Sequence, residues 1–333
     1  MARTNVAEIA RQLKQDIYGP EWPVLQQAAP TVIKAEKNKS KPAKSDVKVA
    51  VLLPDPQIGF RKYEDGTLDP FHDEIAINTA LAIMAYLEDS YGVSQVVNLG
   101  DFLDLSQQGR FIQEAYFQQT TQPSIDYGHL FLAKQRATCP DAKIVLVEGN
   151  HDARFSKFVL VNAAAAYGLR RANIPGAWPV LSVPYLLRCD ELDVEYIDAY
   201  PAGEWWINTR LRAIHGNKVR SSGSTANALV KDNPHISTVF GHVHRLESHY
   251  KSTHDRSGPI RSVAASPGCL CRVDGAVPSF GSGVGTDGKP ATHWEDWQQG
   301  MGVVWYREDG RFSLDMIHII DGVALYHGRE FRA

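Results

Sequence analysis

The sequence predicts an α/β protein in which a buried β-sheet is covered by helices. Short runs of four or five residues, rich in Val, Ile and Leu, recur along the chain, and helix-length segments separate several of them. Such runs are typical of strands buried on both faces, and their alternation with helices indicates an α/β fold. The chain has 333 residues, of which 44% are hydrophobic and 22% charged, so a substantial core is expected.

The individual elements follow from these runs and from their spacing. Five strands are predicted, at residues 50–53, 95–99, 143–147, 211–214 and 237–240. Helices are expected over residues 73–91 and 222–231. Residues 300–320 predict two further strands joined by a turn at Glu308 to Gly310, and residues 322–328 predict a short last strand.

The first 47 residues are expected to be separate from one large domain over residues 48–333. Apolar side chains at helical spacing predict a short amphipathic helix over residues 5–17. Residues 31–48 are rich in lysine and have few large apolar side chains, which predicts a solvated linker. A tether that touches nucleic acid or a partner is the alternative interpretation of this linker.

Composition excludes several classes of protein. No stretch approaches the roughly 18 apolar residues of a membrane span, and no signal-like segment opens the chain, so a soluble cytoplasmic protein is expected. The net charge of −3 argues against a globally basic nucleic-acid binder but leaves room for a local basic groove. Four cysteines are too few for a disulfide framework, and we expect buried thiols; a metal role for Cys269 and Cys271 is the alternative.

Metal-capable side chains follow each of the five predicted strands. They are Asp55, Asp101, Asn150, His215, and the pair His242 and His244. Ligands of α/β folds gather at the carboxyl ends of strands, and Gly100, Gly149 and Gly241 permit a sharp exit from three of them. The five strand ends are therefore expected to converge on one site.

The chemistry of this set indicates two metal ions. With Gln57, it offers seven oxygen and nitrogen ligands and no thiolate, which suits divalent Mn, Fe, Mg or Zn. Seven ligands are too many for one ion, whereas two ions bridged by a carboxylate account for them. Two ions about 3.5–4 Å apart suit phosphoryl transfer because they clamp the attacking and leaving oxygens.

These motifs carry a resemblance to a known family. Asp55-x-Gln57, GDFLD, GNHD, HG and GHVH occur in the order and general spacing of the calcineurin-like metallophosphoesterases, and the similarity covers about residues 48–270. Within that family the chain looks closest to phage and prophage metallophosphoesterases and, more distantly, to DNA-repair nucleases. The resemblance implies a four-layer α/β/β/α sandwich of two mixed sheets flanked by helices.

The resemblance also implies roles for individual residues. One metal ion would be held by Asp55, Gln57, Asp101 and His244, and the other by Asp101, Asn150, His215 and His242. His151 would face the substrate as an acid or a charge-stabilising group, with Asp104 orienting it. Arg154 is a candidate for binding the substrate phosphate, with a surface ion pair as the alternative.

One position departs from the family pattern. Gln57 stands where the commonest first motif has a histidine, and an amide oxygen is a poorer ligand than an imidazole. The first site should therefore bind its ion more weakly and prefer Mn or Mg over Zn. Mn is the expected metal.

The expected reaction is hydrolysis of a phosphodiester in nucleic acid or a nucleotide by a metal-bound water or hydroxide. A phosphomonoesterase or nucleotide pyrophosphatase is the enzymatic alternative, and a metal-stabilised, non-catalytic binding protein is the third hypothesis. Residues 273–299 are Gly-rich and polar and include Trp294 and Trp297, which predicts a loop over the active site.

Overall fold

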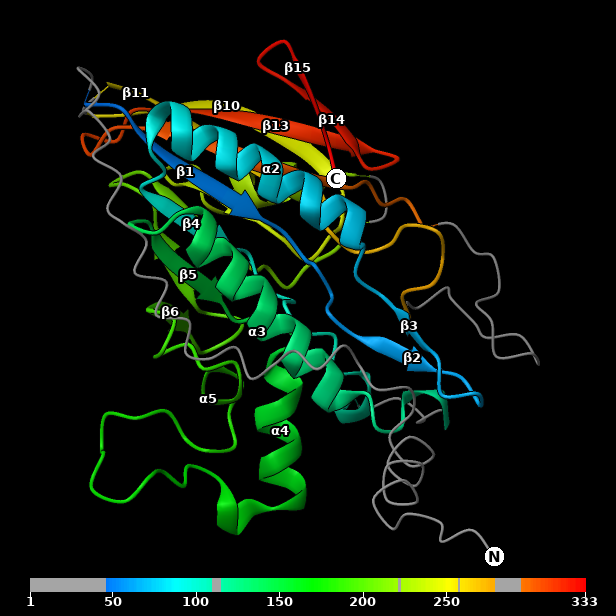
Figure 1. Ribbon diagram of the computed structural model, residues 1–333. Helices are drawn as coiled ribbons and strands as arrows, with labels where there is room; N and C mark the ends of the chain where they lie inside the picture. The colour runs from blue at the N-terminus through cyan, green and yellow to red at the C-terminus, as the bar shows by residue number, and fades with distance from the viewer. Residues whose placement is uncertain (1–45, 110–114, 221–222, 257, 279–294) are drawn as a thin grey trace, which may run out of the picture.

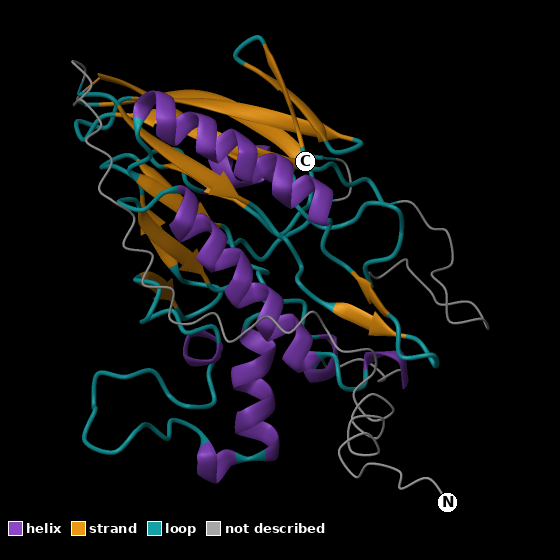
Figure 2. Cartoon of the chain, in the orientation of Figure 1, coloured by secondary structure: helices purple, strands orange, loops and turns teal. Residues whose placement is uncertain are grey.

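The computed structural model describes residues 46–109, 115–220, 223–256, 258–278 and 295–333. The helix expected over residues 5–17 and most of the expected linker lie outside the described residues, as does the middle of the expected loop 273–299. The described chain is a mixed α/β structure with two large mixed sheets flanked by helices (Figure 1, Figure 2). This confirms the predicted α/β class.

The larger sheet has eight strands in the order β15-β14-β13-β12-β1-β4-β5-β6. Four neighbouring strands run parallel: β1 (Lys48–Leu53), β4 (Gln95–Asn98), β5 (Lys143–Val147) and β6 (Val194–Ile197). Four more extend the sheet in antiparallel fashion: β12 (Gly300–Tyr306), β13 (Phe312–Ile320), β14 (Val323–Tyr326) and β15 (Arg329–Arg332). The predicted strands at 50–53, 95–99 and 143–147 are thus the adjacent strands β1, β4 and β5.

The smaller sheet has five strands in the order β10-β11-β9-β8-β7. They are β7 (Glu204–Trp206), β8 (Leu211–Ile214), β9 (Ser237–Phe240), β10 (Leu246–Asp255) and β11 (Gly258–Pro267). The predicted strands at 211–214 and 237–240 are β8 and β9, which pair in parallel. A short separate hairpin, β2 (Phe60–Lys62) with β3 (Leu68–Pro70), follows the first large strand.

Helices connect and cover these sheets. They are α2 (Glu74–Tyr91), α3 (Thr121–Thr138), α4 (Ala153–Asn162), α5 (Val183–Leu186) and α6 (Thr225–Asp232), with short 3-10 turns at Ser106–Gln108, Ala115–Phe117 and Ala164–Ala166. Asp73 caps α2, since its Oδ1 accepts from the backbone N–H groups of Ile75 and Ala76 at 2.9 and 3.0 Å. In the described chain, no helix is both long and apolar enough to cross a membrane.

Alternate side chains of the central strands pack into different cores. From β1, Val49, Val51 and Leu53 contact the core under α2 and α3, which lie across one face of the large sheet (Figure 1). The intervening Ala50 and Leu52 belong to a second core that includes side chains of the smaller sheet. A third core joins α6 to β9 and β11. Both faces of β1 are therefore buried, which explains its uninterrupted apolar sequence.

Candidate metal centre

The residues that follow β1, β4, β5, β8 and β9 converge as expected from the strand ends. Two groups of potential ligands form there, and within each group the ligand atoms lie within 4.8 Å of one another. The first group is Asp101, His215 and His242, and the second is Asp55, Asp101 and His244. Asp101 belongs to both groups, so one carboxylate lies between the two sets of side chains.

Glycines make this close approach possible. A Cβ atom at Gly149 would lie 2.1 Å from the Asp101 backbone nitrogen, and one at Gly241 would lie 2.5 Å from Asp55 Oδ2. The neighbouring N–H groups hold the same carboxylates: His151 N donates to Asp101 Oδ1 at 2.8 Å, and His242 N donates to Asp55 Oδ1 at 2.8 Å. Glycine is required because the loops pack against each other without space for a side chain.

The backbone is strained at the candidate ligands. Five of them have positive φ angles: Asp55 (37°), Gln57 (48°), Asp101 (44°), His242 (71°) and His244 (56°). Each such conformation of a non-glycine residue costs of the order of 1–3 kcal/mol, and strain of this kind clusters at functional sites. A fold stabilised only for packing would have no reason to place five of these angles in one cluster.

His215 presents one nitrogen to the cluster. Its Nδ1 lies 2.8 Å from the carbonyl oxygen of Leu99, which can only accept, so Nδ1 carries the hydrogen. Its Nε2 lies 3.0 Å from Asn150 Oδ1 and 3.3 Å from Asp101 Oδ1. Two oxygens and one nitrogen thus face one another, an arrangement that needs either a proton on Nε2 or a cation between them.

Gln57 joins the second group. Its Nε2 donates to Asp101 Oδ2 at 3.2 Å and lies 3.4 Å from His244 Nε2, which is itself 3.4 Å from Asp55 Oδ1. The Oε1 atom of Gln57 is buried and has no hydrogen-bond partner. An unpaired buried acceptor costs about 1–3 kcal/mol; turning the amide over would bring Oε1 in place of Nε2 toward Asp101 and His244, where a cation would satisfy it.

The pKa values of the titratable side chains in the cluster shift in different directions. Burial alone would raise the pKa of Asp101, but the neighbouring His215, His151 and His242 outweigh burial and hold this pKa well below its ordinary value. For His215, burial acts to lower the pKa, yet Asp101 and Asp55 raise it to about 9. Burial and the adjacent His215 lower the pKa of His242 to about 4, so its imidazole is neutral and has a lone pair to donate.

His151 and Asp104 form a pair at the edge of the cluster. His151 Nδ1 lies 3.0 Å from both the side-chain Oδ1 and the carbonyl oxygen of Asp104, so Nδ1 carries a hydrogen. Burial acts to lower the pKa of His151, but Asp101, together with Asp104, raises it above its ordinary value. Arg154 contacts the same ring at its edge: its Nη2 lies 3.0 Å from His151 Nε2, and its Nη1 donates to the Asp104 carbonyl at 2.9 Å.

Two neighbours of the cluster were not predicted from the sequence. The buried carboxylate of Asp152 accepts from the backbone N–H groups of Phe102, Leu103 and Gly149 at 3.2, 2.9 and 2.9 Å, which ties the loop after β4 to the loop after β5. Its position as the last residue of GNHD was the available signal. Cys271 is the other: a metal role for it was only the alternative interpretation, and its place 3.7 Å from His244 Nδ1 had no signal in the sequence.

A cavity of about 600 Å³ opens beside Asn150. Its lining combines cations, amides and apolar or aromatic side chains: Gln108, Gly109, Asn150, Arg154, Lys157, Phe158, Val161, Asn162 and Tyr200. Lys157 Nζ lies 5.6 Å from the centre of the Tyr200 ring. On the other side of the cluster, the Trp297 ring lies 4.3 Å from the His244 ring, so the described end of the expected loop 273–299 contacts a candidate ligand.

Comparison with known proteins gives similarity to solved structures alone. No protein-family model matches the chain, and no curated protein matches it. Among solved structures, the 5'-nucleotidase precursor from Thermus thermophilus is 12% identical, with 81% of this chain and 53% of that chain covered and a TM-score of 0.30. The chain therefore spans about half the length of that protein, and a TM-score this low does not establish a shared fold.

Proposed function

We propose that this chain is a two-metal phosphoesterase of the calcineurin-like type that hydrolyses phosphodiester bonds in nucleic acid or nucleotides. The observation that carries the proposal is the position of Asp101 in both groups of potential ligands. A shared carboxylate is what two adjacent cations require. The order of helices, large sheet, small sheet and α6 supports the four-layer sandwich, with residues 48–333 as the catalytic domain.

The donor set fits two hard or borderline cations. Asp55, Gln57, Asp101 and His244 would hold one ion, and Asp101, Asn150, His215 and His242 the other. The unpaired Gln57 Oε1 supports this fit, as does the meeting of His215 Nε2 with two oxygens. When bound, the ions neutralise charge on the phosphoryl oxygens and lower the pKa of water. The oxygen-rich first set favours Mn, with Mg, Fe or Zn as alternatives.

Side chains of this protein would donate the proton to the leaving oxygen and bind the substrate phosphate. Asp104 accepts from Nδ1 and so orients the ring of His151, leaving Nε2 toward the reaction. Despite burial, Asp101 and Asp104 raise the pKa of His151, and a ring protonated on Nε2 can protonate the leaving oxygen. In the structure Arg154 lies against Nε2; binding a substrate phosphate would draw its planar guanidinium away and free this nitrogen.

The adjacent cavity supports an anionic substrate with an aromatic part. Arg154 and Lys157 supply positive charge beside Asn150, while Tyr200 and Phe158 supply aromatic surface on which a base can stack. Stacking of this kind contributes about 1–3 kcal/mol per base and tolerates different sequences. A nucleotide or single strand fits this combination better than a small alkyl phosphate.

The test is hydrolysis combined with metal counting. The full chain is stripped with a chelator, reloaded with Mn, and assayed on bis-p-nitrophenyl phosphate and on the corresponding mono-ester; two ions per chain and preference for the diester are expected. Asp101→Ala should lose both bound metal and activity, because both ligand sets share this residue. Asp89→Ala, at an exposed position of α2, is the matched control. Two bound ions and near-normal turnover in Asp101→Ala would contradict the proposal.

A further inference from the structure

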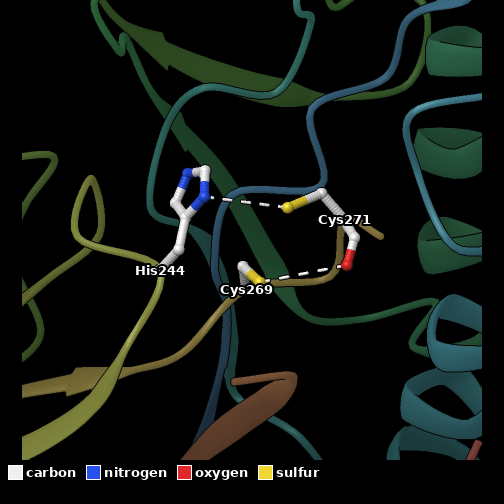
Figure 3. Close-up of side chains that lie close together, drawn as sticks. All are labelled: His244, Cys269 and Cys271. Carbon is white, nitrogen blue, oxygen red and sulfur yellow. Dashed lines mark hydrogen bonds between the residues drawn. The ribbon is translucent and has the colours of Figure 1, made fainter. Parts of the chain in front are cut away.

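A cluster of metal-capable side chains that contains sulfur lies directly beside the proposed centre. Figure 3 shows its members, His244 from the loop after β9 and Cys269 and Cys271 from the segment after β11. One ligand atom from each residue lies within 4.8 Å of the other two. Cys271 Sγ is 3.7 Å from His244 Nδ1. This set of one imidazole and two thiols differs from the oxygen-rich sets described above.

The two thiols are free, buried and weakly bonded. Both cysteines are 0% exposed, and neither forms a disulfide. Among the described residues, the Cys269 sulfur lies 3.6 Å from the Gln298 carbonyl oxygen and 3.9 Å from that of Cys271, and it also contacts the Cys271 thiol. Neither sulfur therefore has a strong competing interaction.

The segment that carries the thiols is held in place. Gly268 has a φ of 89°, and a Cβ atom there would lie 2.4 Å from the Gln298 carbonyl oxygen. Cys269 N donates to the same carbonyl at 3.0 Å, and Gly300 N donates to the Cys269 carbonyl at 3.0 Å. The sulfur atoms are thus presented on a fixed backbone, as a preorganised ligand set requires.

The two nitrogens of His244 face different chemistry. Nε2 lies 3.4 Å from Asp55 Oδ1, a hard oxygen ligand, whereas Nδ1 faces the soft sulfur of Cys271. A neutral imidazole has one lone pair, so a cation on Nε2 requires the hydrogen on Nδ1, and a cation on Nδ1 requires the hydrogen on Nε2. Cations on the two sides therefore compete for one ring.

We propose that His244, Cys269 and Cys271 form a binding site for a thiophilic d10 cation such as Zn²⁺ or Cd²⁺, and that its occupation inhibits the enzyme by withdrawing His244 from the proposed centre. Thiolate and imidazole ligands select such cations, whereas the amide oxygen of Gln57 suits Mn or Mg. On binding, the two thiols release their protons to solvent and no oxidation state changes. The inhibitory part rests on the proposed function; the binding part does not.

The binding part is tested by titrating the full, chelator-treated chain with Cd²⁺ in the presence of excess Mn²⁺. A thiolate-to-cadmium charge-transfer band that saturates at one Cd²⁺ per chain is expected. Cys269→Ala/Cys271→Ala should lose the band, and the matched control Cys139→Ala/Cys189→Ala, which removes the other two buried thiols, should keep it. If the first double variant does not fold, Cys271→Ala alone should weaken the band. The cadmium-113 NMR shift of the unaltered chain then reports whether thiolates bind the ion.

The inhibitory part is tested by following diester hydrolysis in the same titration. One equivalent of Cd²⁺ should lower the rate of the unaltered chain at least about tenfold. Hydrolysis by Cys269→Ala/Cys271→Ala should be the same with and without Cd²⁺. Absence of the band in the unaltered chain overturns the site, and a band without inhibition overturns the competition. Absence of hydrolysis with Mn alone contradicts the proposed function and leaves the band as the measure of binding.

Discussion

The side-chain amide of Gln57 donates to Asp101 Oδ2 across 3.2 Å, while its own Oε1 is buried without a partner. The amide nitrogen therefore faces the carboxylate common to both ligand groups, and the amide has to turn over to present its oxygen to a cation there. This is also the position at which the commonest first motif of the calcineurin-like metallophosphoesterases, which the sequence resembles, has a histidine.

Replacing Gln57 by histidine should tighten the first metal site and shift its preference toward Zn. An imidazole nitrogen is a stronger and softer donor than an amide oxygen. The measurement is the Mn concentration that half-activates the chelated protein, with the Zn content after dialysis against a Mn and Zn mixture. Both should be determined in the Cys269→Ala/Cys271→Ala background, so that the thiols do not take up Zn. If the Mn activation curves of the unaltered protein and of Gln57→His coincide, the side chain at position 57 does not coordinate the metal ion.

His151→Ala should keep both metal ions and slow hydrolysis by about 10²–10⁴ on substrates with poor leaving groups. The loss should be smaller on nitrophenyl esters, whose leaving oxygen needs no proton. His235→Ala, at an exposed position, serves as the control. Equal losses on both kinds of ester would instead assign His151 to phosphate positioning or charge stabilisation.

Gly149→Ala should destabilise the site and release metal. The new methyl group would lie 2.1 Å from the Asp101 backbone nitrogen, and the backbone would have to shift at a cost of about 1–3 kcal/mol. Gly176→Ala is a matched control, since a Cβ there meets no atom within 4 Å, and its effect should stay within about 0.5 kcal/mol. Urea unfolding and metal counting measure both variants. Equal stability and equal metal content of the two variants would show that the loops after β4 and β5 can move apart without loss of stability or metal.

The buried His72 should make stability depend on pH. Burial, with a smaller contribution from Arg272, lowers its pKa to about 3, while an unfolded histidine titrates at about 6.5. The unfolded chain therefore gains a proton first, so stability is full above about pH 6.5 and falls as the pH drops toward 3.

Between pH 7 and pH 5, the unfolding free energy of the metal-free chain should fall about 2 kcal/mol more than that of His72→Phe. Phenylalanine keeps the aromatic contacts with Phe60 and Tyr127 but cannot titrate. Urea unfolding at several pH values gives both curves. If the unfolding free energies of the unaltered chain and of His72→Phe change in parallel with pH, His72 takes up its proton in the folded state as easily as in the unfolded state.

The sequence predicted the strands that position the candidate site because most of their side chains are buried, those of β1, β5 and β9 on both faces and those of β8 mainly on one. After a lysine at their first position, β1 and β5 are continuously apolar, whereas β4, β8 and β9 combine apolar side chains with a few polar ones; each run stops where a polar side chain leaves the sheet. Other elements had no such signal. The long hairpin of β10 and β11 was missed because the side chains of β10 are partly or fully exposed and mostly polar.

The sequence by itself thus determined the α/β class, the five strand ends and the residue types that meet there, since hydrophobic periodicity and glycine exits are local properties. Only the tertiary structure decided which atoms face each other. The contact of Arg154 with the His151 ring nitrogen depends on turn dihedral angles, and the positions of the Gln57 amide and of Cys271 beside His244 depend on packing between segments distant in the chain. A one-dimensional pattern carries no information on these directions, because small changes in the dihedral angles of a turn redirect a side chain by several ångströms.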